Sequence, residues 1–251
     1  DVRQRCCGKM SRLSIGCVAG PLSVLGFSVC WGAGAKPVTA LSGRHGNDGD
    51  ASVGKGRRQW KGRKIRYLIG IDNGGTFSKA AIFDEEGNQI AVSSVPTVTI
   101  TPKPGYTERD MDELWRVNAQ AVRTAIQKSG IDPKDIAGVS FSGHGKGLYM
   151  IDGDGNPSYH GILSTDARAW KYVEDWYKDG TNKKVHEKTV QEILACQPVS
   201  ILAWFQEYHP EVLEKTKYIF AVKDYIRYKL TGEAFTEDTR FSRSNLVNIN
   251  K

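Results

Sequence analysis

The chain has 251 residues, a length that allows one or two domains, and a formal net charge of +7. Residues 1–63 hold 11 of the 35 Lys and Arg but only three of the 28 Asp and Glu, so this segment carries +8 and the remainder −1. The body of the chain therefore gives no electrostatic reason to expect nucleic-acid binding. Four of the five cysteines also lie in the first segment. Cys196 alone cannot form an internal disulfide, which indicates a reduced, cytoplasmic protein without a zinc site.

Residues 1–63 are expected to be a disordered or non-native leader. They run from a basic start through an apolar stretch at 15–30 into a Gly-, Arg- and Ser-rich segment with few apolar residues. The order of basic, apolar and small residues resembles a signal peptide, so a targeting segment is the alternative. Because three glycines and a proline interrupt the short apolar stretch, no membrane partner is expected.

The body opens with three expected strands. An apolar run at 67–71 is typical of a buried strand, and residues 79–84 and the Val- and Ile-rich 89–95 predict two more. Turn residues at 85–88 favour an antiparallel meander. A helix should then run from Asp110, a good N-cap, to a stop at Gly130.

Two further strands are expected at 136–141 and 148–151, and helices at 167–177, 199–208, 210–215 and 223–230. The acids of Asp152-Gly153-Asp154-Gly155-Asn156 could indicate calcium, but the closing glutamate of an EF-hand loop is missing, so a hairpin turn is predicted. The order of elements indicates a mixed α/β unit, not a βαβ dinucleotide fold.

The most informative motif is Asp72-Asn73-Gly74-Gly75-Thr76, between the first two strands. Its glycines let the backbone approach a phosphate and point N–H groups at the oxygens, and Thr76 adds a hydroxyl donor. Asp72 can hold a magnesium ion or its water shell near that phosphate. The alternative interpretation is an ordinary glycine hairpin with a capping aspartate.

This motif and four later segments, in order and spacing, resemble the FGGY carbohydrate kinases of the sugar kinase/hsp70/actin superfamily. The segments lie at 69–80, 104–115, 139–148, 162–169 and 223–246. The resemblance covers 64–251 and implies a ribonuclease H-like (actin-like ATPase) α/β domain, in which helices flank a mixed sheet with a three-strand antiparallel meander. This domain is the N-terminal, sugar-binding half of the family, and the second domain is expected to be absent.

Within the family, the Gly-Lys-Gly-Leu at 145–148, the Leu-Ser-x-Asp-x-Arg at 163–168 and the Ser-x-Ser-Asn-Leu at 242–246 are most similar to the L-xylulokinases. The resemblance implies a pentulose kinase that uses ATP and Mg²⁺ to phosphorylate the C5 hydroxyl of L-xylulose. Another sugar or polyol, such as D-xylulose or L-ribulose, and a non-catalytic sugar-binding module are the alternatives.

The resemblance also assigns residues to roles. It implies that phosphate and magnesium are bound by Asp72, Gly74, Gly75, Thr76 and Lys79, with Asp72 as the metal ligand. It implies that the sugar is bound by His144, Gly145, Lys146, Asp166 and Arg168. Lys146 can donate three hydrogen bonds to hydroxyl oxygens and Asp166 can accept from two vicinal hydroxyls; a solvated loop histidine and a helix N-cap are the alternatives for His144 and Asp166.

The catalytic residue is not assigned, because the family's base aspartate is expected beyond Lys251. Without that base and the nucleotide-binding half, the chain is expected to be inactive. The expected partners are a sugar and ATP, and the oligomeric state, including a homodimer of the full-length protein, stays open.

Overall fold

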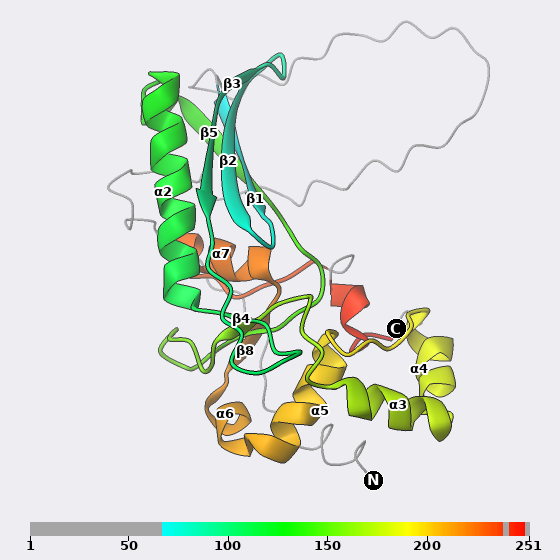
Figure 1. The fold of residues 1–251 in the computed structure, drawn as a ribbon. Helices are drawn as coiled ribbons and strands as arrows, with labels where there is room; N and C mark the ends of the chain where they lie inside the picture. Colours follow the sequence, from blue (N-terminus) through cyan, green and yellow to red (C-terminus); the bar gives the residue numbers. More distant parts are fainter. Residues whose placement is uncertain (1–66, 238–240, 249–251) are drawn as a thin grey trace, which may run out of the picture.

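The structure, a computed structural model, describes residues 67–237 and 241–248. Its main sheet has the strand order β3-β2-β1-β5, in which β1 (Tyr67–Asn73), β2 (Phe77–Asp84) and β3 (Gln89–Pro96) form an antiparallel meander. The fourth strand, β5 (Ile136–Gly143), pairs with β1 in parallel (Figure 1). The predicted meander and mixed sheet are therefore confirmed.

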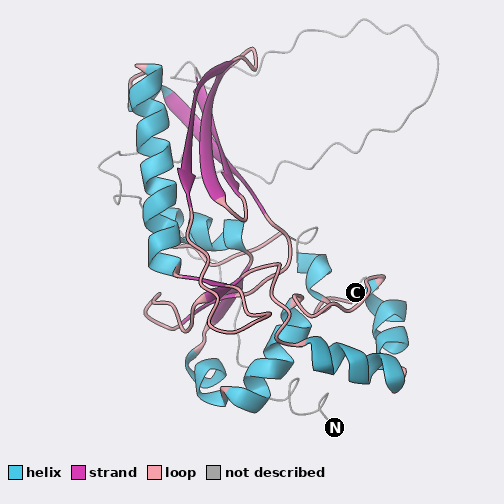
Figure 2. Ribbon diagram, in the orientation of Figure 1, coloured by secondary structure: helices cyan, strands magenta, loops and turns pink. Residues whose placement is uncertain are grey.

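Helix α2 (Met111–Ser129) lies along one face of this sheet (Figure 2). The Asp110 carboxylate accepts from the backbone N–H groups of Asp112 and Glu113, and Gly130 ends the helix in the left-handed conformation with a φ of 67°. The predicted cap and stop are both correct. The apolar stripe of α2 buries Ala121 and Val122 against the alternating inward side chains of the meander, so the period of each element fixes its buried face.

The remaining elements form a second packed region below the sheet. Its short strand pairs are β4 (Glu108–Arg109) with β7 (Gly161–Ile162), and β6 (Tyr149–Ile151) with β8 (Tyr218–Phe220). Its helices are α3 (Trp170–Lys178), α4 (Thr181–Thr189), α5 (Pro198–Tyr208), α6 (Pro210–Lys215) and α7 (Val222–Thr231). Two 3₁₀ turns, η1 (Pro133–Asp135) and η2 (Ser242–Ser244), complete the described elements.

Two clusters hold this region together. One joins Met111 and Leu114 of α2 to Tyr225 and Ile226 of α7, and the other surrounds Trp204 and its neighbours on α5. Because α7 also packs against β5, the lower region is fixed directly beneath the ends of β1 and β5.

The structure departs from the sequence-based expectations in a few places. Helix α4 was not predicted, because its residues 181–189 carry almost no apolar face, and α3 begins at Trp170 instead of residue 167. The two-residue strands β4 and β7 are too short for any alternation to show. The Asp152 turn is confirmed, since the Asp152 carboxylate accepts from the N–H groups of Asp154 and Asn156. The expected leader, 1–63, lies outside the described residues.

Candidate functional site

The phosphate-hairpin motif and the predicted sugar loop meet at the carboxyl ends of β1 and β5. Asn73 is paired with Gly143 in the parallel register, and the Asn73 side-chain amide donates to the Ser142 carbonyl at 3.3 Å. The His144 N–H donates to the Asn73 carbonyl at 3.0 Å. Ligands of α/β sheets bind at the carboxyl ends of parallel strands, so this edge is the natural place for a site.

The hairpin presents its polar groups to solvent. Asp72 and Lys79 are exposed and stand directly opposite one another across β1 and β2. The Gly74 N–H is used inside the turn, where it donates to the Phe77 carbonyl at 3.0 Å. Gly75 and Thr76 are exposed, and a Cβ on Gly75 would meet nothing within 4 Å. The face beside Gly75 is therefore open to a ligand.

A buried arginine braces this hairpin from inside. Arg109 is 1% exposed, and its guanidinium donates to the carbonyls of Gly74 at 3.3 Å and Gly75 at 2.5 Å. Burial lowers the pKa of Arg109, and the nearby Tyr149 and Glu113 oppose that shift. With both carbonyls occupied from below, the glycine peptides are held in one orientation.

The predicted sugar loop, residues 143–147, is shaped by its glycines and by Lys146. Lys146 has a φ of 71°, unusual for a residue with a side chain, and Gly147 a φ of 78°. A Cβ on Gly147 would lie 2.4 Å from the Ile162 carbonyl oxygen, so only glycine fits there. The loop leaves Lys146 half-buried, while His144 bonds through Nε2 to the buried Tyr149 hydroxyl at 3.0 Å.

Asp166 and Arg168 lie in a buried network beside the loop. One Asp166 oxygen accepts from the backbone N–H and Nε of Arg168, and the other from the Thr107 N–H at 2.7 Å and from Arg168 Nη2. Arg168 also donates to Glu108 at 2.7 Å and stacks on the rings of Tyr106 and Trp204. Burial opposes the charge of Arg168, but the hydrogen bonds to the two carboxylates prevail and raise its pKa.

The structure thus brings together Asp72, Gly74, Gly75, Thr76 and Lys79 in the hairpin, and His144, Gly145 and Lys146 in the adjacent loop. Asp166 and Arg168 are 2% and 5% exposed, and Asp166 already accepts four hydrogen bonds. In this conformation they support neighbouring segments and do not present the Asp166 carboxylate to a sugar.

Two cationic side chains were missed from the sequence. Arg109 follows Glu108 in the 104–115 segment, and Arg243 lies in the 242–246 segment, so the resemblance covered both positions without marking them. A two-residue strand is too short to show an alternation of buried and exposed residues, so the sequence does not indicate that Arg109 is buried. Only the fold shows that its guanidinium contacts the hairpin.

The hairpin fits a phosphate-bound magnesium ion better than a protein-caged one. Asp72 is a single exposed carboxylate beside an open glycine backbone. Within 67–237 and 241–248, no group of three or more His, Cys, Asp or Glu side chains is arranged to hold a metal. Mg²⁺ commonly takes one or two carboxylates and completes its shell with phosphate oxygens and water, which matches this donor set.

Comparison with known families agrees with this geometry. Residues 67–251 match the model of the N-terminal domain of the FGGY family of carbohydrate kinases. The chain belongs to this family. Its fold is the ribonuclease H-like, actin-like ATPase fold that the sequence predicted.

The chain is 40% identical over 185 residues to a probable L-xylulose kinase of Pasteurella multocida, across 74% of this chain and 38% of that protein. It is 36% identical over 184 residues to the L-xylulose/3-keto-L-gulonate kinase of Escherichia coli, across 73% of this chain and 37% of that protein. The chain therefore spans well under half the length of these curated relatives.

Solved structures give the same picture. A gluconate kinase of Lactobacillus acidophilus superimposes with a TM-score of 0.70 at 26% identity, over 74% of this chain and 37% of that one. A ligand-bound xylulose kinase of the same species gives 0.69 at 27% identity, over 73% and 37%. No helix in the described part of the chain is both long and apolar enough to cross a membrane.

Proposed function

We propose that residues 64–251 are the sugar-binding half of an ATP-dependent pentulose kinase that phosphorylates the C5 hydroxyl of L-xylulose. The observation that carries this proposal is the pairing of Asn73 with Gly143, which sets a glycine hairpin suited to phosphate beside a loop with two polar side chains. The identities to proteins named as L-xylulose kinases support the choice of sugar.

In this proposal the hairpin binds the phosphates of ATP and the associated magnesium ion. Asp72 would hold Mg²⁺ or its water shell, while Gly74, Gly75 and Thr76 would face the phosphate and Lys79 would add positive charge on the same face. The ion would neutralise charge on the phosphate oxygens. Arg109 has a positioning role, because it fixes the peptides of Gly74 and Gly75 and does not reach the ligand itself.

His144, Gly145 and Lys146 hold the sugar from the neighbouring loop. Lys146 donates to hydroxyl oxygens, and His144 is oriented by Tyr149. Asp166 and Arg168 maintain the wall behind the loop; direct contact of Asp166 with the sugar would require the network with Thr107 to open.

The reaction joins the sugar C5 oxygen to the γ-phosphorus of ATP and breaks the bond from that phosphorus to the β,γ-bridging oxygen. The hydroxyl proton passes to a base, and ADP leaves. We place that base near the junction of the family's two domains and the adenosine site in the second domain, both beyond Lys251. The 251-residue chain should then bind sugar without phosphorylating it.

Another pentulose or polyol is the main alternative substrate, and a non-catalytic sugar-binding module is the alternative function. A substrate panel of L-xylulose, D-xylulose, L-ribulose, glycerol and a sugar acid, with ATP and the complete gene product, separates these cases. Phosphorylation of L-xylulose with the highest kcat/KM supports the proposal. Absence of phosphorylation of every sugar, despite binding, would favour the non-catalytic module.

The 251-residue chain provides the second test. Calorimetric titration should show L-xylulose binding, and an ADP-release assay with the same preparation should show no turnover above background. Turnover by this chain alone would contradict the assignment of the base to residues beyond Lys251.

A further inference from the structure

Three left-handed residues connect the sugar loop to the segment around η2. Among residues 67–237 and 241–248, the residues other than glycine with a positive φ are Lys146 at 71°, Val190 at 52° and Asn245 at 58°. This backbone conformation is unfavourable for residues with a side chain, least so for Asn, and a branched residue such as Val adopts it only under constraint. Strained residues persist where surrounding contacts hold them, and they gather at functional sites. The contacts that hold Lys146 and Val190 therefore bear on the site.

The Asn245 side chain brackets Val190. Its amide Nδ2 donates to the Thr189 hydroxyl at 3.3 Å and to the Gln191 carbonyl at 3.2 Å, and these are the residues on either side of Val190. Asn245 is 7% exposed, whereas the Val190 side chain is 56% exposed and gains little from packing. Hydrogen bonds, and not burial of Val190, therefore hold the turn out of α4, and two of them come from Asn245.

The segment that begins at this turn leads to the sugar loop. Its Cys196 carbonyl accepts from the Gly147 N–H of the loop at 2.8 Å. The next residue, Gln197, is 2% exposed and donates through Nε2 to the Arg243 carbonyl at 3.4 Å. The segment is therefore bonded to the sugar loop and, at its two ends, to η2 and to the residue that follows η2.

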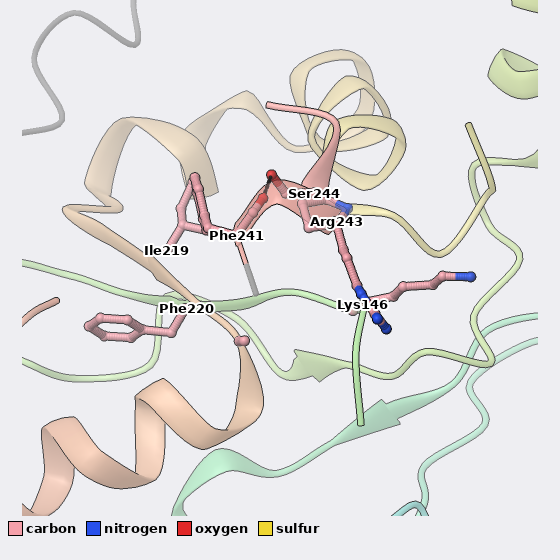
Figure 3. Close-up of a pocket in the computed structure, with 9 residues that line it drawn as sticks. Lys146, Ile219, Phe220, Phe241, Arg243 and Ser244 are labelled. Atoms are coloured by element: carbon pink, nitrogen blue, oxygen red, sulfur yellow. Dashed lines mark hydrogen bonds between the residues drawn. The ribbon is translucent and has the colours of Figure 1, made fainter. Parts of the chain in front are cut away.

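Figure 3 shows how close the sugar loop lies to η2. A cavity of about 20 Å³, room for roughly one water molecule, separates them, and its lining includes Lys146 and Gly147 from the loop and Arg243 and Ser244 from η2. The Lys146 side chain extends away from this cavity and from the Arg243 guanidinium. The backbone of Lys146 is therefore flanked by η2, while its left-handed turn directs the ammonium to the opposite side.

We propose that Asn245 is a positioning residue for the sugar loop. It holds residues 189–191 and thereby fixes the position of the Cys196 carbonyl. The hydrogen bond from Gly147 to that carbonyl keeps Lys146 in the left-handed conformation that directs its ammonium toward the sugar. The proposal rests on the sugar-binding role proposed above for the loop, and it adds a residue that does not touch the substrate. Asn suits this position because it tolerates a left-handed backbone and carries an amide with two N–H donors.

Asn245→Asp tests the proposal with almost no change of shape. Asp tolerates the left-handed backbone, but its carboxylate has no N–H to donate and would face the Gln191 carbonyl oxygen. In the complete gene product, the KM for L-xylulose should rise about tenfold, the range of one lost hydrogen bond. The KM for ATP should stay within about twofold of the wild-type value, since the start of the loop keeps its bond to Asn73 and the hairpin its bonds to Arg109. A merely structural role would lower the active fraction, and with it kcat, and leave both KM values unchanged.

Three further variants sharpen this test. Gln120→Glu, at an exposed position of α2, adds the same charge by the same amide-to-carboxylate change and should keep both wild-type KM values. Lys146→Gln should raise the KM for L-xylulose, and Asn245→Asp combined with it should raise that KM no further, because Asn245 acts through Lys146. Asn245→Gly accepts the positive φ but lacks the amide, so it should match Asn245→Asp.

The outcomes separate this inference from the kinase proposal. An unchanged KM for L-xylulose in Asn245→Asp, an equal rise in the KM for ATP, or a further rise in the combined variant overturns the positioning role. Failure of both Asn245 variants to fold also overturns it, because the residue would then be a structural one. If the wild type phosphorylates another sugar of the panel, the choice of L-xylulose is wrong, and the same KM comparison with that sugar still tests Asn245. If the wild type binds a sugar without phosphorylating it, the dissociation constant from calorimetry replaces KM, whereas binding of no sugar overturns both proposals.

Discussion

The His144 N–H donates to the carbonyl oxygen of Asn73 at 3.0 Å, and this bond ties the first residue after β5 to the last residue of β1. The hairpin begins directly after Asn73 and the sugar loop runs on from His144. Because both start from one hydrogen-bonded pair, displacement of either segment should displace the other.

Gly143→Ala tests this coupling. A Cβ at Gly143 would lie 2.6 Å from Cγ1 of the buried Val222 and 3.3 Å from Cβ of Asn73. We expect the free energy of unfolding to fall by about 1–3 kcal/mol, as for other overpacked sites, and sugar affinity to fall with it. Urea denaturation and calorimetry measure the two effects.

The matched control is Gly75→Ala, because a Cβ there meets nothing within 4 Å. Its stability should change by less than about 0.5 kcal/mol, as is usual for exposed positions. If Gly143→Ala proved as mild as this control, the close approach of β1, β5 and α7 would not constrain the site as described.

Arg168→Met tests the buried network. The substitution fills much of the same volume but leaves the Asp166 and Glu108 carboxylates without the guanidinium that now bonds to both. We expect a loss of about 3–5 kcal/mol of unfolding free energy, the usual cost of removing one partner from a buried ion pair. Chemical denaturation measures it.

Lys178→Met is the comparison for that variant. Lys178 pairs with Glu174 at 2.7 Å on the surface of α3, where solvent screens the charges, so no measurable change in stability is expected. A loss for Arg168→Met no larger than for Lys178→Met would mean that the network is not a structural support.

The sequence predicted the glycine hairpin and the helix from Asp110 to Gly130, because each depends on local chemistry: paired glycines, a capping aspartate and a regular apolar period. It could not show that the Asp166 carboxylate accepts hydrogen bonds from Thr107 and Arg168. Thr107 lies 59 residues before Asp166 and Arg168 two residues after it, and only the fold brings all three into one buried cluster. A carboxylate that faces a ligand and one that braces a loop have the same sequence signature. Their difference lies in tertiary contacts.

Cys196 can report the charge of Lys146. Burial raises the pKa of the Cys196 thiol, while the Lys146 ammonium opposes that rise. A raised pKa leaves less thiolate at a given pH, so alkylation of Cys196 by iodoacetamide at pH 7.5 should be slower than for a free cysteine with a pKa of ~8.5. Peptide mass spectrometry isolates this cysteine from the four in residues 1–63.

Lys146→Gln should slow that alkylation further and move its midpoint to higher pH, because the cation that favours the thiolate is gone. Lys183→Gln, at an exposed lysine of α4, should leave the profile unchanged. An unaltered or faster reaction in Lys146→Gln would place the ammonium too far from Cys196 to act on its thiolate.

Asp72→Asn separates phosphate chemistry from sugar binding. Asp72 is exposed at the end of β1 and is the carboxylate of the glycine hairpin, whereas His144 and Lys146 lie in the neighbouring loop. An asparagine keeps the shape but removes the charge that would hold Mg²⁺ or its water shell. In the complete gene product we expect kcat to fall by about 100-fold or more, comparable to loss of one preorganised electrostatic group. The dissociation constant for L-xylulose, from calorimetry, should stay within about twofold, a difference under 0.5 kcal/mol.

Asp84→Asn, at the far end of β2, provides the control and should retain wild-type kcat. A fall in sugar affinity that accounts for the whole loss of activity in Asp72→Asn would instead assign Asp72 to the sugar, and the assignment of the hairpin to phosphate and the loop to the sugar would be wrong.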